Sequence, residues 1–384
     1  MAYQFTVPGR TFIGENALVL AENAVKSLGK KALIVTGKIV TKTGTVEILM
    51  DYLKKWNIDY EIFNDITGEP TDVMIAEGVS AYEASGCDFL IGIGGGSPLD
   101  SVKAIAVVAT LKCNIGDLMG KEIEGKFPPM LLIPTTAGTG SETTKFTVIT
   151  DTKKNIKMLL KGEKLLPDVA IIDPAFALTA PKGITAATGM DALTHAVESY
   201  TSRKSNEITD MFALSAIKRI FKYLPAAWKD GSDKKAREEM AMAAYEAGVC
   251  INNASVTLVH GMSRPIGAMF HVPHGISNAM LIKECLTFAL DGCYEKFATI
   301  ARTIGAVGDD VSDEIAAKAF LKALVALCKE IEIPTLAQYG IEKKDFVEVI
   351  DKMATDAIAS GSPANTIKDV TKEDVVAIYE KLWD

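Results

Sequence analysis

Side chains able to bind a metal are concentrated in the second half of the sequence. The chain has four histidines, His195, His260, His271 and His274, and all lie within one 80-residue stretch. Asp191 precedes His195 by four residues in a strongly helical segment, so both side chains would lie on one helix face. An isolated histidine is usually a packed or surface residue. One carboxylate with three clustered imidazoles, however, is suited to a divalent transition metal with a position left for substrate.

A glycine-rich turn stands between an expected strand and an expected helix in the first half. It reads Ile93-Gly94-Gly95-Gly96-Ser97-Pro98-Leu99-Asp100. Glycines let the backbone approach a ligand closely, and the free N–H groups at a helix start can bind pyrophosphate. The turn fits neither the Gly-x-Gly-x-x-Gly fingerprint nor the Walker loop. Its position favours phosphate binding, and a plain structural turn is the alternative.

A second loop, Pro134–Glu142, is dense in hydroxyl groups and glycines just after another expected strand. Its short side chains could contact a ribose or a nicotinamide amide, although an ordinary loop has the same composition. Two such loops at neighbouring strand ends favour a dinucleotide site, since ligands of open parallel sheets bind at the carboxyl ends of the strands.

Both loops require a parallel sheet to position them. Short β-branched runs, expected as strands, lie at 30–37, 59–65, 88–97 and 128–136, and helical patterns lie at 41–56, 71–86 and 97–111. This alternation is typical of βαβ units.

Beyond about residue 180 the pattern becomes helical. Helical periodicity covers 184–200, 208–224, 237–251, 314–331 and 372–384. We therefore predict an α/β dinucleotide-binding domain with a Rossmann-like parallel sheet over residues 1–180, and an all-α metal-binding domain over residues 181–384. The join is expected near the proline-bearing segment 171–183.

Composition excludes several classes of function. The chain has 384 residues, 48% hydrophobic and 23% charged, which is typical of a globular protein long enough for two domains. Its net charge of −8 argues against nucleic-acid binding. No apolar run reaches the roughly 18–20 residues of a membrane span, and the N-terminal residues lack a secretory pattern. Six scattered cysteines without a Cys-x-x-Cys pair favour a reducing cytoplasm.

Four motifs occur in order: GGGSPLD, PTTAGTGSETT, ATGMDALTHAVESY and HGMSRPIGAMFHVPHGISNA. Together they resemble the iron-containing (group III) alcohol dehydrogenases, the group related to glycerol dehydrogenase and dehydroquinate synthase. The resemblance runs along nearly the whole chain. It implies an N-terminal dinucleotide domain, a C-terminal helical domain and an active-site cleft between them. It also implies a homodimer or larger homo-oligomer, for which the expected N-terminal edge strand is a candidate contact.

The resemblance assigns roles residue by residue. It implies metal ligation by Asp191, His195, His260 and His274, with His271 at a pocket position close to the metal. The implied cofactor contacts are Gly94, Gly95, Gly96 and Ser97 at the pyrophosphate, Asp100 at the nicotinamide end, Thr135, Thr136 and Thr139 at phosphate or ribose, and Lys157 and Leu178 on the ribose and adenine sides.

One departure from the family bears on the cofactor. Many NAD-specific members carry an aspartate where this sequence has Gly37, which is followed by Lys38. A carboxylate there binds the ribose 2′-hydroxyl and repels a 2′-phosphate. We therefore predict that NADP(H) is accepted in addition to NAD(H) or in preference to it, unless Lys38 is only a solvated residue at a helix start.

A second departure bears on the substrate. Arg264 stands four residues after His260, where many members have histidine. A guanidinium on the metal-facing side could clamp a carboxylate or phosphate bidentately. It could equally form a salt bridge to the cofactor domain.

The expected reaction interconverts a small primary alcohol, or a hydroxy acid, and its aldehyde or semialdehyde with NAD(P)(H). The metal would lower the pKa of the bound alcohol, and His271 would relay its proton to solvent. The ligand set admits zinc, which affinity order favours, and Fe(II), which the resemblance favours. The alternatives are a glycerol or polyol dehydrogenase, a dehydroquinate-synthase-like lyase on the same scaffold, and a catalytically silent nucleotide-binding protein.

Overall fold

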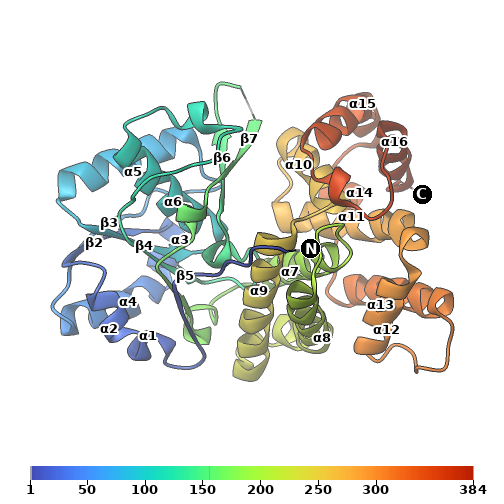
Figure 1. Cartoon of the computed structure of the whole chain (residues 1–384), viewed down its shortest axis with the longest axis horizontal. Coiled ribbons are helices and arrows are strands. Elements are labelled where there is room, and N and C mark those ends of the chain that lie inside the picture. Colours follow the sequence, from blue (N-terminus) through green and yellow to red (C-terminus); the bar gives the residue numbers. More distant parts are fainter. Residues whose placement is uncertain (1, 155, 384) are drawn as a thin grey trace. The chain divides into compact units, whose positions relative to one another are not determined.

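The computed structural model describes residues 2–154 and 156–383. The chain folds into two compact units, drawn in Figure 1 with the first in blue to green and the second in green to red. The first unit is Phe5–Ala180, and the second runs from Pro181 onward together with the few residues before Phe5. The first is an α/β unit and the second is helical, which confirms the predicted fold class.

The α/β unit is built on a six-stranded sheet in which every neighbouring pair is parallel. Its order is β1-β8-β5-β4-β2-β3, from β1 (Arg10–Ile13), β8 (Val169–Ile172), β5 (Met130–Pro134), β4 (Phe89–Gly94), β2 (Lys31–Val35) and β3 (Asp59–Phe63). From β2 the chain passes to the edge strand β3, whereas from β4 it continues to β5 and β8 on the other side of the sheet. The strand order therefore reverses between β2 and β4, which is where ligands bind in doubly wound sheets.

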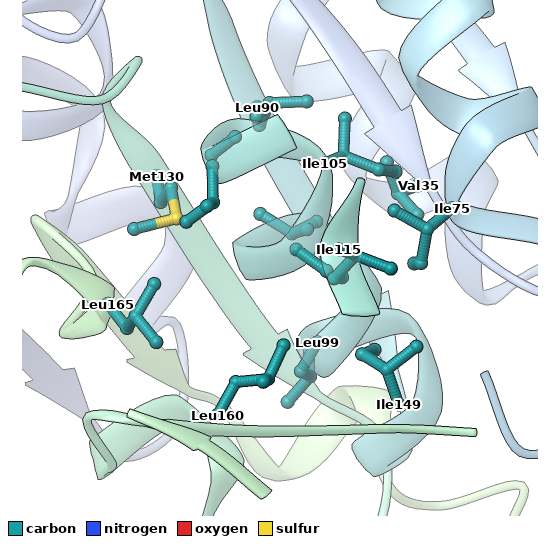
Figure 2. Packing of buried hydrophobic residues seen from close by; sticks show 14 of the residues in the cluster. Val35, Ile75, Leu90, Leu99, Ile105, Ile115, Met130, Ile149, Leu160 and Leu165 are labelled. Atoms are coloured by element: carbon teal, nitrogen blue, oxygen red, sulfur yellow. The ribbon is translucent and has the colours of Figure 1, made fainter. Parts of the chain in front are cut away.

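Hydrophobic residues cover both faces of this sheet, because successive side chains of a strand point to opposite sides. On β4, Leu90 belongs to one core and Ile91 to the other. The first core packs against α5 (Asp72–Ser85) and α6 (Gly96–Leu111), and Figure 2 shows its side chains. The second packs against α1 (Ala17–Leu20), α2 (Glu22–Lys26) and α4 (Thr45–Lys55).

Several features of this unit differ from the sequence prediction, among them the sheet strand β8, which was not expected. The helix expected over 41–56 is divided into α3 (Lys38–Lys42) and α4, because Gly44 adopts a left-handed conformation with φ of 78°. The antiparallel hairpin of β6 (Phe146–Asp151) and β7 (Ile156–Lys161) was not expected either. Ile149 and Leu160 anchor this hairpin in the first core, as Figure 2 shows.

The helical unit is organised around α7 (Lys182–Tyr200), which is buried along most of its length and packs against α8, α9 and α11. The helices that follow it are α8 (Glu207–Lys229), α9 (Lys234–Ala254), α10 (Leu258–Phe270), α11 (His274–Ala289), α12 (Tyr294–Thr303), α13 (Asp313–Glu330), α14 (Leu336–Tyr339), α15 (Lys343–Ala359) and α16 (Lys372–Lys381). Within the described residues, none of the helices is long and apolar enough to cross a membrane.

Candidate metal and cofactor sites

Three helices of the second unit bring together the four candidate metal ligands. Asp191 and His195 lie one turn apart on α7, His260 lies in the first turn of α10, and His274 is the first residue of α11. Helix α11 packs against both α7 and α10. Asp191 and His195, four residues apart on α7, therefore form one side of a cluster that α10 and α11 complete.

The cluster converges on one carboxylate oxygen. Asp191 Oδ1 lies 3.7 Å from His195 Nε2, 3.7 Å from His260 Nε2 and 3.8 Å from His274 Nε2. Asp191, His195 and His260 are buried, and the His195 and His260 rings stack with centroids 4.6 Å apart. Ligands about 2.0–2.2 Å from a common tetrahedral ion are about 3.4 Å from one another. The distances from Asp191 Oδ1 to the three imidazole nitrogens thus lie within a few tenths of an ångström of this spacing, and Asp191, His195 and His260 offer ligand atoms within 4.8 Å of one another.

A glycine next to His274 makes this approach possible. A Cβ at Gly275 would stand 2.3 Å from the carbonyl oxygen of Ala187 and 3.4 Å from the Cβ of Asp191. Since real Cβ atoms do not come so close to a carbonyl oxygen, only glycine lets α11 lie this near α7. Gly275 therefore sets the distance between His274 and Asp191.

Asn278, one turn after His274 on α11, touches three of the four candidate ligands. Its Nδ2 donates to Asp191 Oδ1 at 2.8 Å and lies 3.2 Å from His260 Nε2 and 3.3 Å from His274 Nε2. Its Oδ1 is buried and has no hydrogen-bond partner within the described residues. An amide nitrogen carries two N–H donors and no acceptor, so it can donate to Asp191 Oδ1 and to one of the two imidazole nitrogens at a time. The three atoms surround this nitrogen as they would surround a cation.

The electrostatics give these ligands the protonation states that metal binding needs. Burial alone would raise the pKa of Asp191, but His195, His274 and His260 outweigh it, and the pKa lies below its usual value. Burial, together with His195, holds the pKa of His260 well below its usual value. Near neutral pH the site therefore presents a carboxylate and a neutral imidazole.

The predicted cofactor residues occupy two loops that pack against each other in the α/β unit. Gly94 has φ of 154°, a value that disfavours other residues, and its carbonyl oxygen accepts from Thr135 N at 2.8 Å. A Cβ on Gly96 would come within 2.9 Å of Thr139 Cγ2. The glycine turn between β4 and α6 thus fits closely against the threonine-rich loop after β5, and Ser97 and Thr136 lie in the same two segments.

Sequence reasoning missed a buried lysine that fixes the second loop. Lys103 Nζ donates to the carbonyl oxygens of Ser141, Thr144 and Phe146 at 2.7–2.8 Å, and to Thr144 Oγ1 at 3.1 Å. Burial lowers the pKa of Lys103 to about 8, although the nearby carboxyl groups of Asp100 and Glu142 oppose this shift. We refer to Lys103, its four oxygen acceptors, Asp100 and Glu142 as the lysine cluster.

Asp100, predicted at the nicotinamide end, is part of this cluster. Its two carboxylate oxygens accept from Ser141 Oγ and from the Val148 backbone N–H, the latter at 2.8 Å. Burial raises its pKa, against the effect of Lys103. The carboxylate therefore holds the threonine-rich loop and β6 to α6.

The other predicted cofactor residues lie at the sheet's carboxyl edge or on the hairpin. Gly37 and Lys38 follow β2, and Lys38 Nζ forms an ion pair with Asp65 Oδ1 at 2.7 Å. Lys157 on β7 pairs with Glu69 at 2.7 Å. Leu178 follows the short 3-10 helix η4 (Pro174–Phe176) beyond β8. No motif in the sequence singles out Asp65.

His271 and Arg264 flank the ligands along the chain. His271 ends α10 in a left-handed conformation with φ of 55° and is exposed, three residues before His274. Arg264 Nη1 donates to Ser362 Oγ at 3.0 Å, a bond within the helical unit.

The chain matches known proteins over both units. Residues 8–174 match the family "Iron-containing alcohol dehydrogenase" and residues 185–383 match "Fe-containing alcohol dehydrogenase family, C-terminal". It is 38% identical to the NAD-dependent methanol dehydrogenase of Bacillus methanolicus, over 96% of this chain and 98% of that protein. It is 37% identical to the 1,3-propanediol dehydrogenase of Citrobacter freundii, over 99% of each. The crystal structure of a 1,3-propanediol oxidoreductase superposes with a TM-score of 0.96 at 34% identity, over 100% of both chains.

Proposed function

The chain belongs to the iron-containing alcohol dehydrogenase family, and we propose that Asp191, His195, His260 and His274 bind its catalytic metal. The protein is an oxidoreductase that interconverts an alcohol and its aldehyde. The observation that carries the proposed site is the convergence of three imidazole Nε2 atoms on one oxygen of Asp191. We propose residues 1–180 as the dinucleotide-binding domain and residues 181–384 as the metal-binding domain.

Each proposed group has a separate task. A metal held there would supply Lewis acidity that lowers the pKa of the substrate hydroxyl, and a nicotinamide cofactor would supply the hydride acceptor. The Asp191 carboxylate and neutral imidazoles bind the ion while leaving most of its charge unneutralised. Exposed His271 is proposed to pass the hydroxyl proton to solvent. The N–H groups from Gly95 to Ser97 are proposed to bind the pyrophosphate.

Family membership supports iron over zinc, although the donor set accepts both. The relatives named for propanediol and methanol oxidation support small primary alcohols as substrates, and they do not favour the lyase alternative. We further propose a homo-oligomer in the cytoplasm, the latter because all six cysteines are free thiols.

The metal site is tested by removing a ligand. In Asp191→Ala or His274→Ala, we expect metal content and alcohol oxidation to be lost together, while circular dichroism shows the fold retained. Asp291→Ala, which removes a carboxylate paired with Lys368 elsewhere in the helical unit, is the control. Adding Fe(II) or Zn(II) to the metal-free wild type, with turnover followed at 340 nm, identifies the active ion. A ligand variant with full activity and no metal would refute the site.

We also propose that NADP(H) is accepted. Gly37 places no carboxylate at the end of β2, and Lys38 is a cation beside it, but the Asp65 carboxylate already pairs with that cation. Asp65 would therefore compete with a 2′-phosphate. Exposed ion pairs contribute up to about 1 kcal/mol, so Asp65→Asn should raise the NADPH-to-NADH ratio of kcat/KM by up to about fivefold.

Lys38→Ala should lower the same ratio, and Lys42→Ala, at the other end of α3, should leave it unchanged. A strong NADH preference that none of these substitutions alters would contradict the proposal.

An acidic substrate is the second candidate. Arg264 would have to exchange its bond to Ser362 for a substrate carboxylate or phosphate. If it does, Arg264→Ala should reduce kcat/KM for a semialdehyde acid but not for a simple aldehyde. An equal loss for both substrates would leave Arg264 with the role of holding Ser362.

A further inference from the structure

Glu198 is a fully buried carboxylate on α7, three residues after His195. Its Oε1 accepts from Thr257 Oγ1 at 2.7 Å and from the Val259 backbone N–H at 2.6 Å. Its Oε2 lies 2.5 Å from His260 Nδ1. The carboxylate thus binds the first turn of α10 at three points, on the side of His260 away from Asp191.

These contacts determine which nitrogen of His260 carries the proton. Burial raises the pKa of Glu198, although the hydrogen bonds from Thr257 and Val259 oppose this shift. In the ionised form the carboxylate can only accept, so Nδ1 is the protonated nitrogen that donates to Oε2. The Nε2 atom is then left with its lone pair. This state also suits the Asn278 amide, whose Nδ2 lies 3.2 Å from that Nε2 and can donate to Asp191 and to one of the two imidazole nitrogens beside it.

The neighbouring ligand His195 lacks such support. Its Nδ1 is buried and has no hydrogen-bond partner within residues 2–154 and 156–383. The ring stacks on His260 with an interplanar angle of 19°, so the two rings pack against each other. A shift of the His260 ring would therefore also change the packing of a second proposed ligand.

We propose that Glu198 is a positioning residue that holds His260 as the Nδ1-protonated tautomer with its Nε2 directed at the metal. The inference rests on the proposed metal site. A carboxylate behind a metal-binding imidazole fixes the ring and raises its basicity, and losing such a partner typically lowers metal affinity about 10–100-fold.

The decisive substitution is Glu198→Gln, which keeps the size and the acceptor for Thr257 and Val259. Its amide N–H would face His260 Nδ1 and donate to it, so the ring proton would move to Nε2. Nitrogen-15 NMR of histidine-labelled, metal-free protein reports this tautomer directly. We expect Nδ1–H for His260 in the wild type and Nε2–H in Glu198→Gln.

The second readout is metal affinity, measured with Co(II) and with Zn(II) by chelator competition. Glu198→Gln should bind about 10–100-fold more weakly and show an altered Co(II) absorption spectrum. Glu246→Gln is the matched control: it alters a buried glutamate of α9 that accepts from Ser215 at 2.8 Å and pairs with Arg219. It should leave both the tautomer and the affinity unchanged.

The outcomes separate the two claims. A wild type that binds neither ion refutes the metal site, whereas the His260 tautomer still tests Glu198. Nε2–H in the wild type overturns the role of Glu198 even if Glu198→Gln fails to fold. Wild-type affinity in a folded Glu198→Gln overturns it as well.

Discussion

The lysine cluster of the α/β unit and the metal-ligand cluster of the helical unit both gather electron-pair donors from separate elements. In the first, the chain supplies the cation, because Lys103 Nζ lies among four oxygens. In the second, Asp191, His260 and His274 converge beside the neutral amide of Asn278. Where a lysine side chain binds the converging acceptors, as in the lysine cluster, the group supports the fold. Where the chain supplies only a neutral amide, as in the metal-ligand cluster, the acceptors indicate a site for a separate ion.

The largest expected effect tests the first half of this comparison. Lys103→Met leaves three carbonyl oxygens and the nearby Asp100 and Glu142 carboxyl groups without their buried cation. Breaking a buried charge network costs about 3–5 kcal/mol, so we expect this loss in the stability of the α/β unit by hydrogen exchange. Metal content of the helical unit should not change. Lys112→Met, which removes an exposed pair with Glu83, is the control and should have little effect.

A pH experiment examines the charge balance of the same cluster. Burial raises the pKa of Glu142 to about 7, against the opposing effects of its own backbone N–H and of Lys103. The folded state therefore holds this proton at pH values where the unfolded chain has lost it. The resulting stability is fully present below about pH 4.5 and is lost as pH rises through 7.

Between pH 5 and pH 7.5, Glu142→Gln should remove about 2 kcal/mol from the change in the free energy of unfolding, at about 1.4 kcal/mol per pKa unit. Urea unfolding of both proteins across this range gives the difference. Identical slopes would mean that Glu142 ionises normally and that the lysine cluster carries a second full negative charge.

The smallest effect concerns the distance between two ligands in the helical unit. In Gly275→Ala, the new Cβ collides with the Ala187 carbonyl, so α11 must move away from α7. We expect about 1–2 kcal/mol of destabilisation, as for other overpacked sites, and weaker Zn(II) binding because His274 moves from Asp191. Gly183→Ala, where a Cβ meets nothing within 4 Å, should change neither quantity. Unchanged Zn(II) affinity would show that Gly275 does not set this geometry.

Local spacing explains what the sequence made predictable. Asp191 and His195 share a helix, so their common face follows from helical periodicity alone. The strand positions predicted that the glycine turn and the threonine-rich loop would reach one sheet edge. Lys103 and Glu198 were missed because their partners lie 41 and 62 residues away. Asn278 was missed because its hydrogen bond to Asp191 spans 87 residues, although His274 is only four residues away. A lysine, a glutamate or an asparagine indicates a role at these positions only when the folded structure shows which groups it contacts.

Asp191, His195 and Glu198 occupy positions i, i+4 and i+7 of one buried helix. Two proposed ligands and the carboxylate behind a third are thus carried by two consecutive helical turns. The side chain of His274, on another helix, is 36% exposed and could move away from an ion without a backbone change. Exchange of a bound ion would therefore begin at His274, while Asp191 and His195 would keep their places for as long as α7 stays folded.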